Sequence, residues 1–147
     1  MAEALAIGAP VVALESTLFA HGLPRPRNLE IAGELEALLR DAGVLPATVG
    51  IVGGTPVVGL SASEIELLST RTVAKASTRD LPLTGARGVH AATTVAATSW
   101  LASRAGVRIF ATGGLGGVQR GASRRVAESA GRGAVSRMPG TVVCAGG

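Results

Sequence analysis

The chain has 147 residues, which is enough for one domain with a buried core but hardly for two. Hydrophobic residues make up 47% and charged residues 16%, so the composition excludes a disordered chain. The net charge is +4, but the arginines are dense only between residues 120 and 137 and aromatic residues amount to 2%, which argues against a nucleic-acid partner. A site for a small anionic ligand fits this pattern better.

The single cysteine and the hydropathy pattern bear on where the protein works. Cys144 alone excludes an internal disulfide and indicates a reducing compartment, and its apolar neighbours predict a small buried side chain. No secretory leader is evident, and no apolar run is long enough to cross a bilayer. The sequence therefore predicts a soluble, cytoplasmic protein with no membrane partner.

The first strand is predicted at residues 11–14, a short apolar run typical of a buried parallel strand. Glu15 follows directly and so stands at the carboxyl end of that strand, where open α/β sheets bind their ligands. A carboxylate there is either a functional group or an ordinary residue that is solvated or paired with an arginine, and the pattern leaves both interpretations open. His21, Pro24 and Pro26 then predict a rigid loop.

The first long helix is predicted over residues 29–41. Asn28 is expected to cap its N-terminus and Gly43 to end it. Its apolar stripe is expected to consist of Leu35, Leu38, Leu39 and Ala42.

A hairpin and a capped helix are predicted next. Strands at residues 47–52 and 55–60 flank a two-glycine turn, and Pro56 places the second strand at an edge of the sheet. Residues 61–64, Ser-Ala-Ser-Glu, match the capping box that begins a helix.

A further strand, residues 72–77, contains the only lysine of the chain, Lys75. Lys75 is either an outward-pointing residue of an edge strand or a desolvated amine that faces a site, and both interpretations stay open. Residues 84–88 are predicted to form a loop. His21 and His90 are expected to make ordinary hydrogen bonds, since no group of residues has zinc spacing.

The last elements complete an α/β alternation. An alanine-rich helix is predicted over residues 91–105, a strand over 107–111 and a further strand over 141–145. The glycine-rich segment 112–117 between the last two is either an anion-binding loop or a tight turn. The alternation predicts an α/β fold, a layered sheet with flanking helices.

Several short motifs occur together in a fixed order. They are Ala13-Leu14-Glu15-Ser16-Thr17, His21-Gly22, Asn28-Leu29, Pro46-Ala47-Thr48, Gly59-Leu60-Ser61, Lys75-Ala76-Ser77-Thr78-Arg79-Asp80, Thr93-Thr94-Val95-Ala96-Ala97-Thr98 and Phe110-Ala111-Thr112-Gly113-Gly114-Leu115-Gly116-Gly117-Val118. In residues 11–122 the chain resembles the pseudouridine-5′-phosphate glycosidase family, also called the indigoidine synthase A-like family.

The resemblance implies an enzyme that reversibly cleaves the C–C glycosidic bond of pseudouridine 5′-phosphate, giving uracil and ribose 5-phosphate. In that family the opened sugar is held as an imine on a lysine, a glutamate moves protons, and a divalent metal, usually manganese, assists. By motif, Glu15 corresponds to the general acid/base and Lys75 to a substrate-binding lysine. Val95 corresponds to a backbone contact to the substrate, and Ser129 and Ala130 to further substrate contacts. The resemblance also suggests a homo-oligomer, such as a trimer.

The chain departs from the family pattern after residue 121. Ala127 stands where the family has its metal-binding aspartate, and Gly131 replaces a second aspartate, so the sequence leaves open whether the Mn²⁺ that the family implies binds here. Cys144-Ala145-Gly146-Gly147 ends where the family's imine-forming lysine would follow. We therefore expect a family-like catalytic portion at residues 1–122, a divergent tail at 123–147 with a possible last strand, and a fold truncated relative to the family.

Two functions follow from these features. The first is a pseudouridine-5′-phosphate glycosidase whose activity is impaired in this chain. The alternative is a non-catalytic, truncated remnant that binds a sugar phosphate weakly or not at all. A nucleic-acid-binding module based on the arginine-dense tail is a weaker third possibility.

Overall fold

The computed structural model describes residues 1–114 and 140–145 of the chain. Its strands are β1 (Val11–Glu15), β2 (Leu45–Val52), β3 (Thr55–Val58), β4 (Ala74–Ala76), β5 (Ala91–Thr93), β6 (Ile109–Thr112) and β7 (Thr141–Cys144). Its helices and helical turns are α1 (Ala2–Ala6), η1 (Leu18–Gly22), α2 (Arg27–Asp41), α3 (Ala62–Thr70), η2 (Thr78–Asp80), α4 (Leu81–Arg87) and α5 (Val95–Arg104).

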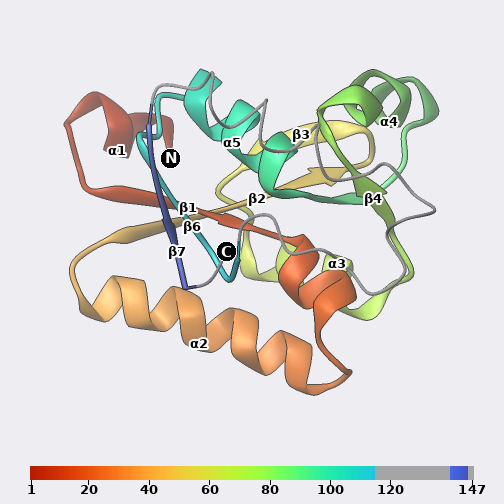
Figure 1. The fold of residues 1–147 in the computed structure, drawn as a ribbon, viewed down its shortest axis with the longest axis horizontal. Helices are drawn as coiled ribbons and strands as arrows, with labels where there is room; N and C mark the ends of the chain where they lie inside the picture. Colours follow the sequence, from red (N-terminus) through yellow and green to blue (C-terminus); the bar gives the residue numbers. More distant parts are fainter. Residues whose placement is uncertain (115–139, 146–147) are drawn as a thin grey trace.

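The strands form one curled sheet with helices on both sides. Helices α2 and α3 lie on one side of it, and α1, α4 and α5 lie on the other (Figure 1). The predicted α/β layered fold is thus confirmed. Within residues 1–114 and 140–145, no helix is long and apolar enough to span a membrane.

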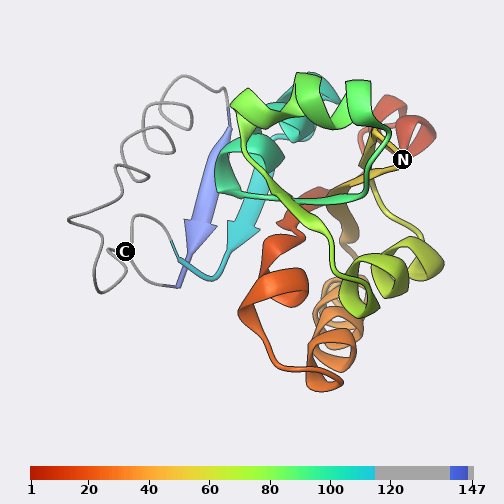
Figure 2. The same cartoon turned by 90° about the vertical axis from the view of Figure 1, so that its right-hand side faces the viewer.

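The sheet is mixed, with the strand order β4-β5-β2-β1-β6-β7 and with β3 paired to β2 outside this path. Strands β1, β2, β6 and β7 are parallel to one another, whereas β5 runs antiparallel to β2 and parallel to β4. Figure 2 shows β6 and β7 side by side, with α4 and α5 at the top of the view and α2 and α3 in its lower right part.

Strands β1 and β5 meet end to end along β2. Strand β3 occupies one edge of β2 at residues 49–52, so β1 pairs with residues 45–49 and β5 with residues 50–51 on the other edge. Because β1 and β5 run in opposite directions, their carboxyl ends converge beside Val49. This arrangement brings Glu15, at the end of β1, close to Thr93, at the end of β5.

A cluster of buried hydroxyl groups joins these two strand ends. Ser16 Oγ accepts a hydrogen bond from the Thr93 backbone N–H (2.8 Å), and Thr93 Oγ1 donates to the carbonyl of Val49 (2.7 Å). Thr98 Oγ1 lies 2.9 Å from Thr93 Oγ1. Ser16, Thr93 and Thr98 are fully buried, so these hydrogen bonds replace the ones that the hydroxyl groups would make to water in the unfolded chain. The residue after Glu15 is thereby fixed to the start of α5.

The two faces of the sheet pack against different sets of side chains. Small aliphatic residues of β1 and β2 pack against α5 together with Phe110. On the opposite face, Phe19 of η1, Ala32 of α2 and Leu68 of α3 form a second core. The small side chains allow the helix to approach the sheet closely.

The expected apolar stripe of α2 was wrong, because polar residues supply much of its buried face. The buried positions are Asn28, Ala32 and Glu36, whereas Leu38 is 67% exposed. Asn28 lies inside the helix and not at its N-cap, and its Nδ2 donates to the carbonyls of Phe19 (2.8 Å) and Ser69 (2.9 Å). Spacing of apolar residues cannot detect a helix face that is buried through hydrogen bonds.

Features specified by a few neighbouring residues were predicted correctly. The hairpin pairs Val52 with Thr55 across its glycine turn, and Pro56 lies on a strand paired only to β2. The capping box is present, since Ser61 Oγ accepts from the Glu64 backbone N–H and Glu64 accepts from the Ser61 backbone N–H. Gly43, at φ 73°, follows the end of α2 as expected.

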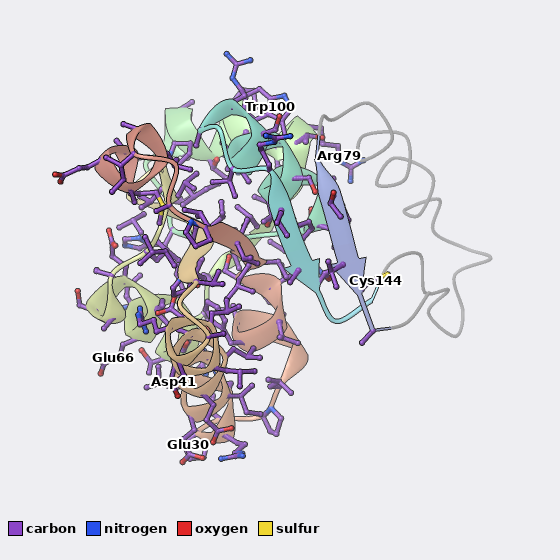
Figure 3. All side chains as sticks on the ribbon, turned by 90° about the vertical axis from the view of Figure 1, so that its left-hand side faces the viewer. Glu30, Asp41, Glu66, Arg79, Trp100 and Cys144 are labelled. Carbon is purple, nitrogen blue, oxygen red and sulfur yellow. The ribbon has the colours of Figure 1, made fainter. Side chains whose placement is uncertain are left out.

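Three other predictions were wrong. Residues 84–88 are not a loop, because α4 continues to Arg87 and ends at Gly88, whose φ of 61° forms the cap. Residues 91–105 are not one helix, because residues 91–93 form β5 before α5 begins; a short buried alanine run does not distinguish strand from helix. Cys144 is exposed (Figure 3), because β7 forms the edge of the sheet.

The expected strand at residues 141–145 is present as β7. The proposed boundary at residue 122 falls in residues 115–139, outside the described residues, and stays a prediction.

The hairpin turn offers a matched pair of glycine substitutions. Gly54 has φ 82°, and a Cβ on it would lie 2.9 Å from the Gly88 Cα and 3.1 Å from the Gly85 carbonyl oxygen. Gly53 has φ 56°, but a Cβ there would meet nothing within 4 Å. We expect Gly53→Ala to lower the free energy of unfolding by about 1 kcal/mol and Gly54→Ala by about 3 kcal/mol, since only the second adds a backbone clash. Urea unfolding measures both, and equal losses would contradict the packing of the turn against α4.

Candidate active site at the end of β1

Glu15 ends β1 and is held by two threonine hydroxyls. Thr17 Oγ1 donates to Glu15 Oε2 at 2.7 Å, and Thr112 Oγ1 donates to Glu15 Oε1 at 2.5 Å. The side chain is half-buried. Within residues 1–114 and 140–145 Glu15 forms no ion pair with an arginine, so the pairing that the sequence left open is not found there. Each carboxylate oxygen therefore has a fixed donor and a further lone pair for another group.

Thr112 connects Glu15 to the start of the glycine-rich segment. It ends β6, which lies beside β1, so the carboxyl ends of the two parallel strands are neighbours. Its hydroxyl has one proton, which goes to Glu15 over the shorter distance, and its oxygen accepts from the Gly114 backbone N–H at 3.4 Å. A change in the position of this segment would therefore move the Thr112 hydroxyl and alter its hydrogen bond to the Glu15 carboxylate.

Loss of the Thr112 hydroxyl has a predictable cost. Thr112→Val keeps the side-chain shape but removes the donor to a carboxylate, so we expect the free energy of unfolding to fall by about 1–3 kcal/mol. Thr112→Ser keeps the donor and should recover most of the loss. Thr141→Val, on the exposed start of the neighbouring β7, serves as the control and should change little. Equal stability of the Val and Ser variants in urea unfolding would show that the hydrogen bond contributes nothing.

A cavity of about 210 Å³ opens beside Glu15, between the sheet, η1 and α2. Its apolar walls are formed by Leu14, Leu18, Phe19, Ala32, Leu35 and Ala111. Its polar lining comes from Glu15, Thr48 and Thr112, and the Thr48 hydroxyl is already engaged, since it donates to buried Glu36 at 2.6 Å. Among the described residues that line the cavity, none is basic.

Lys75 and Val95 lie on neighbouring elements but outside the cavity lining. Lys75 is an exposed residue of the edge strand β4, paired in register with Ala92 of β5, so the structure has the edge position that the sequence allowed. Val95 is the first residue of α5, two positions after Thr93, whose amide binds Ser16. The structure therefore brings the start of α5 to the end of β1, where Glu15 stands.

Comparison with known proteins identifies the family of this fold and site. The family described as indigoidine synthase A like protein matches residues 1–147. The chain belongs to the indigoidine synthase A-like family. It is 57% identical over 145 residues to a protein of Saccharopolyspora erythraea and 53% identical over 147 residues to one of Deinococcus radiodurans, both named pseudouridine-5′-phosphate glycosidase. These matches cover 98% and 99% of this chain but 48% and 47% of the relatives, so the chain spans about half the length of the curated relatives it matches.

Two solved structures of this family have the same fold. An indigoidine synthase A-like protein of Thermotoga maritima superposes with a TM-score of 0.84 at 38% identity, covering 95% of this chain and 47% of its own. The prealnumycin C-glycosynthase AlnA, solved in complex with ribulose 5-phosphate, superposes with a TM-score of 0.83 at 42% identity, covering 99% and 47%.

The metal expected from the family has no matching donor set in the described part of the chain. No group of three or more His, Cys, Asp or Glu side chains there could hold a metal ion. Glu15 is surrounded by hydroxyls and apolar side chains, not by further carboxylates. Ala127, Ser129 and Ala130, which align with the family's metal and substrate positions, lie in residues 115–139, outside the described residues. Mn²⁺ binding and these two substrate contacts stay predictions.

The histidines make the ordinary hydrogen bonds that the sequence predicted. His21 Nε2 lies 3.1 Å from the Val73 carbonyl oxygen, and His90 Nδ1 accepts from the Gly53 backbone N–H at 3.0 Å. Sequence reasoning missed Thr17 and Thr112 as partners of Glu15. Their positions held a usable signal: Thr17 follows Glu15 by two residues, and Thr112 directly follows the strand predicted at residues 107–111.

Proposed function

We propose that this chain carries the proton-transfer part of a pseudouridine-5′-phosphate glycosidase site, which cleaves a C–C glycosidic bond to give uracil and ribose 5-phosphate. The observation that carries the proposal is Glu15, held by Thr17 and Thr112 at the mouth of a cavity where two parallel strands end. The names of the relatives support the substrate, and the ribulose 5-phosphate bound to AlnA supports a sugar phosphate as the ligand class.

In this proposal Glu15 is the general acid/base. When the bond between C1′ of the sugar and C5 of uracil breaks, its electron pair stays on C5, which takes a proton that a carboxylic acid at hydrogen-bond distance can supply. Water supplies the oxygen that C1′ gains in ribose 5-phosphate. In the reverse direction the carboxylate takes that proton back. Thr17 and Thr112 fix the direction in which the group points, so that its free lone pairs face the substrate.

Lys75 and Val95 are proposed to bind the sugar phosphate, as are Ser129 and Ala130. An exposed lysine ammonium can contact a phosphate as a point charge, and a backbone N–H at the start of α5 can donate to a phosphate or sugar oxygen. The homo-oligomer and the cytoplasmic location inferred from the sequence are likewise proposals.

We further propose that the 147-residue chain alone is impaired. By the family resemblance, Ala127 stands in place of the metal-binding aspartate. Groups that act together in catalysis cannot be removed singly without losing most of the rate. The alternative is a remnant that binds a sugar phosphate weakly or not at all.

Uracil release from pseudouridine 5′-phosphate with Mn²⁺ separates these possibilities. We expect the chain alone to be at least roughly a thousandfold slower than the Saccharopolyspora erythraea protein, because Ala127 replaces the metal-binding aspartate. A chimera of residues 1–114 followed by the rest of that relative should release uracil at a rate close to the relative's own. Full activity of the chain alone would contradict the proposal that it is impaired. A chimera that folds but releases no uracil would contradict the proposed function and favour the alternative, a non-catalytic remnant.

A further inference from the structure

We propose that His21 and Arg25 are positioning residues for Lys75. They hold the segment that leads from α3 into β4, and so determine where the lysine ammonium stands relative to Glu15. This inference rests on the proposed function, in which Lys75 binds the sugar phosphate. It adds two residues that act on that ligand only through Lys75.

The segment between α3 and β4 is bound at every second carbonyl. Arg25 Nε donates to the Ser69 carbonyl at 2.9 Å, and Arg25 Nη2 donates to the Arg71 carbonyl at 2.6 Å. The Val73 carbonyl oxygen lies 3.1 Å from His21 Nε2, and because a carbonyl only accepts, this nitrogen is the donor. The two side chains thus fix the path of the chain up to the residue before β4 begins.

Capping of a helix end explains only one of these hydrogen bonds. Helix α3 ends at Thr70, so the Ser69 carbonyl belongs to its last turn, where a cation is favourable. The Arg71 and Val73 carbonyls lie beyond the helix, and binding them does not cap it. In residues 1–114 and 140–145 no ion pair includes Arg25, so its guanidinium there binds backbone carbonyls and no carboxylate.

Strand β4 has few hydrogen bonds of its own to hold Lys75 in place. It has three residues and, in the part of the chain that the structure describes, pairs only with β5. Its far end is fixed, because Ala76 pairs in register with Thr93, whose backbone N–H donates to Ser16 Oγ at 2.8 Å. Lys75 lies between this end and the end that is held at Val73.

Both ends of β4 are attached to the segment that follows Glu15. Ser16 is the next residue, and His21 lies in η1, whose Leu18 and Phe19 line the cavity beside Glu15. A displacement of this segment would therefore move the cavity wall and the lysine together. An ammonium contacts a phosphate as a point charge, so a misplacement of about 1 Å is enough to weaken the contact.

Titration of ribose 5-phosphate into the whole chain, followed by NMR, tests the role of Arg25. Arg25→Met keeps an unbranched side chain but removes both hydrogen bonds, and it should weaken the affinity for ribose 5-phosphate roughly fivefold. Arg27→Met is the matched control. Arg27 is a neighbouring exposed arginine that pairs with Glu30 and Glu34 of its own helix, so its replacement should leave the affinity unchanged.

A double-mutant cycle with Lys75→Met separates positioning from a general loss of stability. Arg25→Met should cause no further loss of affinity in a chain that already has Lys75→Met, because Arg25 acts through the lysine. His21 is tested by a second pair of variants that does not depend on the folding of Arg25→Met. His21→Gln places an amide N–H near the position of Nε2 and should retain the affinity, whereas His21→Leu has no donor and should weaken it. Urea unfolding confirms that each variant is folded.

Three results would overturn the inference. They are the same loss for Arg25→Met with and without Lys75, a loss no larger than that for Arg27→Met, and equal affinities of the His21→Gln and His21→Leu variants. Absence of ribose 5-phosphate binding by the unaltered chain would also overturn it. None of these results decides the proposed function, which uracil release by the chimera tests separately.

Discussion

Replacing Glu15 by glutamine in the chimera is expected to lower kcat for uracil release by about 10²–10⁴-fold, the usual contribution of a positioned general acid or base. The fold should survive the change. The carboxamide oxygen can still accept from one threonine, and the amide N–H can donate to the hydroxyl oxygen of the other. KM should change little, because Gln occupies the same space and removes only the exchangeable proton.

Glu66→Gln is the matched control for this variant. Glu66 is an exposed residue of α3, and its side chain points away from the body of the molecule (Figure 3), so its replacement should leave kcat unchanged. Steady-state kinetics at several pH values would measure kcat and KM of both variants. A Glu15→Gln chimera with the parent's kcat would show that another group moves the proton.

The second large effect is expected on stability. Asn28→Leu removes the two N–H groups that bind the carbonyls of Phe19 and Ser69 at a position that is 2% exposed. The Phe19 carbonyl loses its side-chain donor, whereas the Ser69 carbonyl still accepts from Arg25 Nε at 2.9 Å. We expect the free energy of unfolding to fall by about 2 kcal/mol, since an orphaned buried acceptor costs on the order of 1–3 kcal/mol. Because Phe19 lines the cavity, the loss should also loosen one cavity wall.

The control for Asn28 is a substitution on the same helix that breaks no contact. Leu38 is 67% exposed, so Leu38→Ala should change the free energy of unfolding by less than about 0.5 kcal/mol. Urea unfolding followed by circular dichroism measures both variants. A loss for Asn28→Leu no larger than that for Leu38→Ala would mean that the two carbonyls find other donors.

The sequence predicted those parts of the fold that a few neighbouring residues specify. The capping box at Ser61 and the glycine turn at Gly53 depend on local backbone chemistry. The meeting of β1 and β5 was not predicted, since an antiparallel partner inserted along β2 is a long-range event. Likewise the sequence predicted Asn28 to be a helix cap, because its two carbonyl partners, Phe19 and Ser69, are distant in the chain.

The candidate site shows the same division. The position of Glu15 at a strand end followed from the apolar run before it, and strand β1 is where it was expected. Its hydroxyl partners could not be inferred with equal ease, because Thr112 lies 97 residues away and its role depends on β6 pairing with β1. Lys75 stayed ambiguous in sequence because an alternating strand pattern does not tell an edge from a covered position.

The most direct test of the central claim is a crystal structure of the Glu15→Gln chimera with pseudouridine 5′-phosphate. The account predicts C5 of the base about 3 Å from the residue 15 side chain. A substrate bound with its glycosidic bond remote from residue 15 would contradict the assignment of Glu15 as the group that moves the proton.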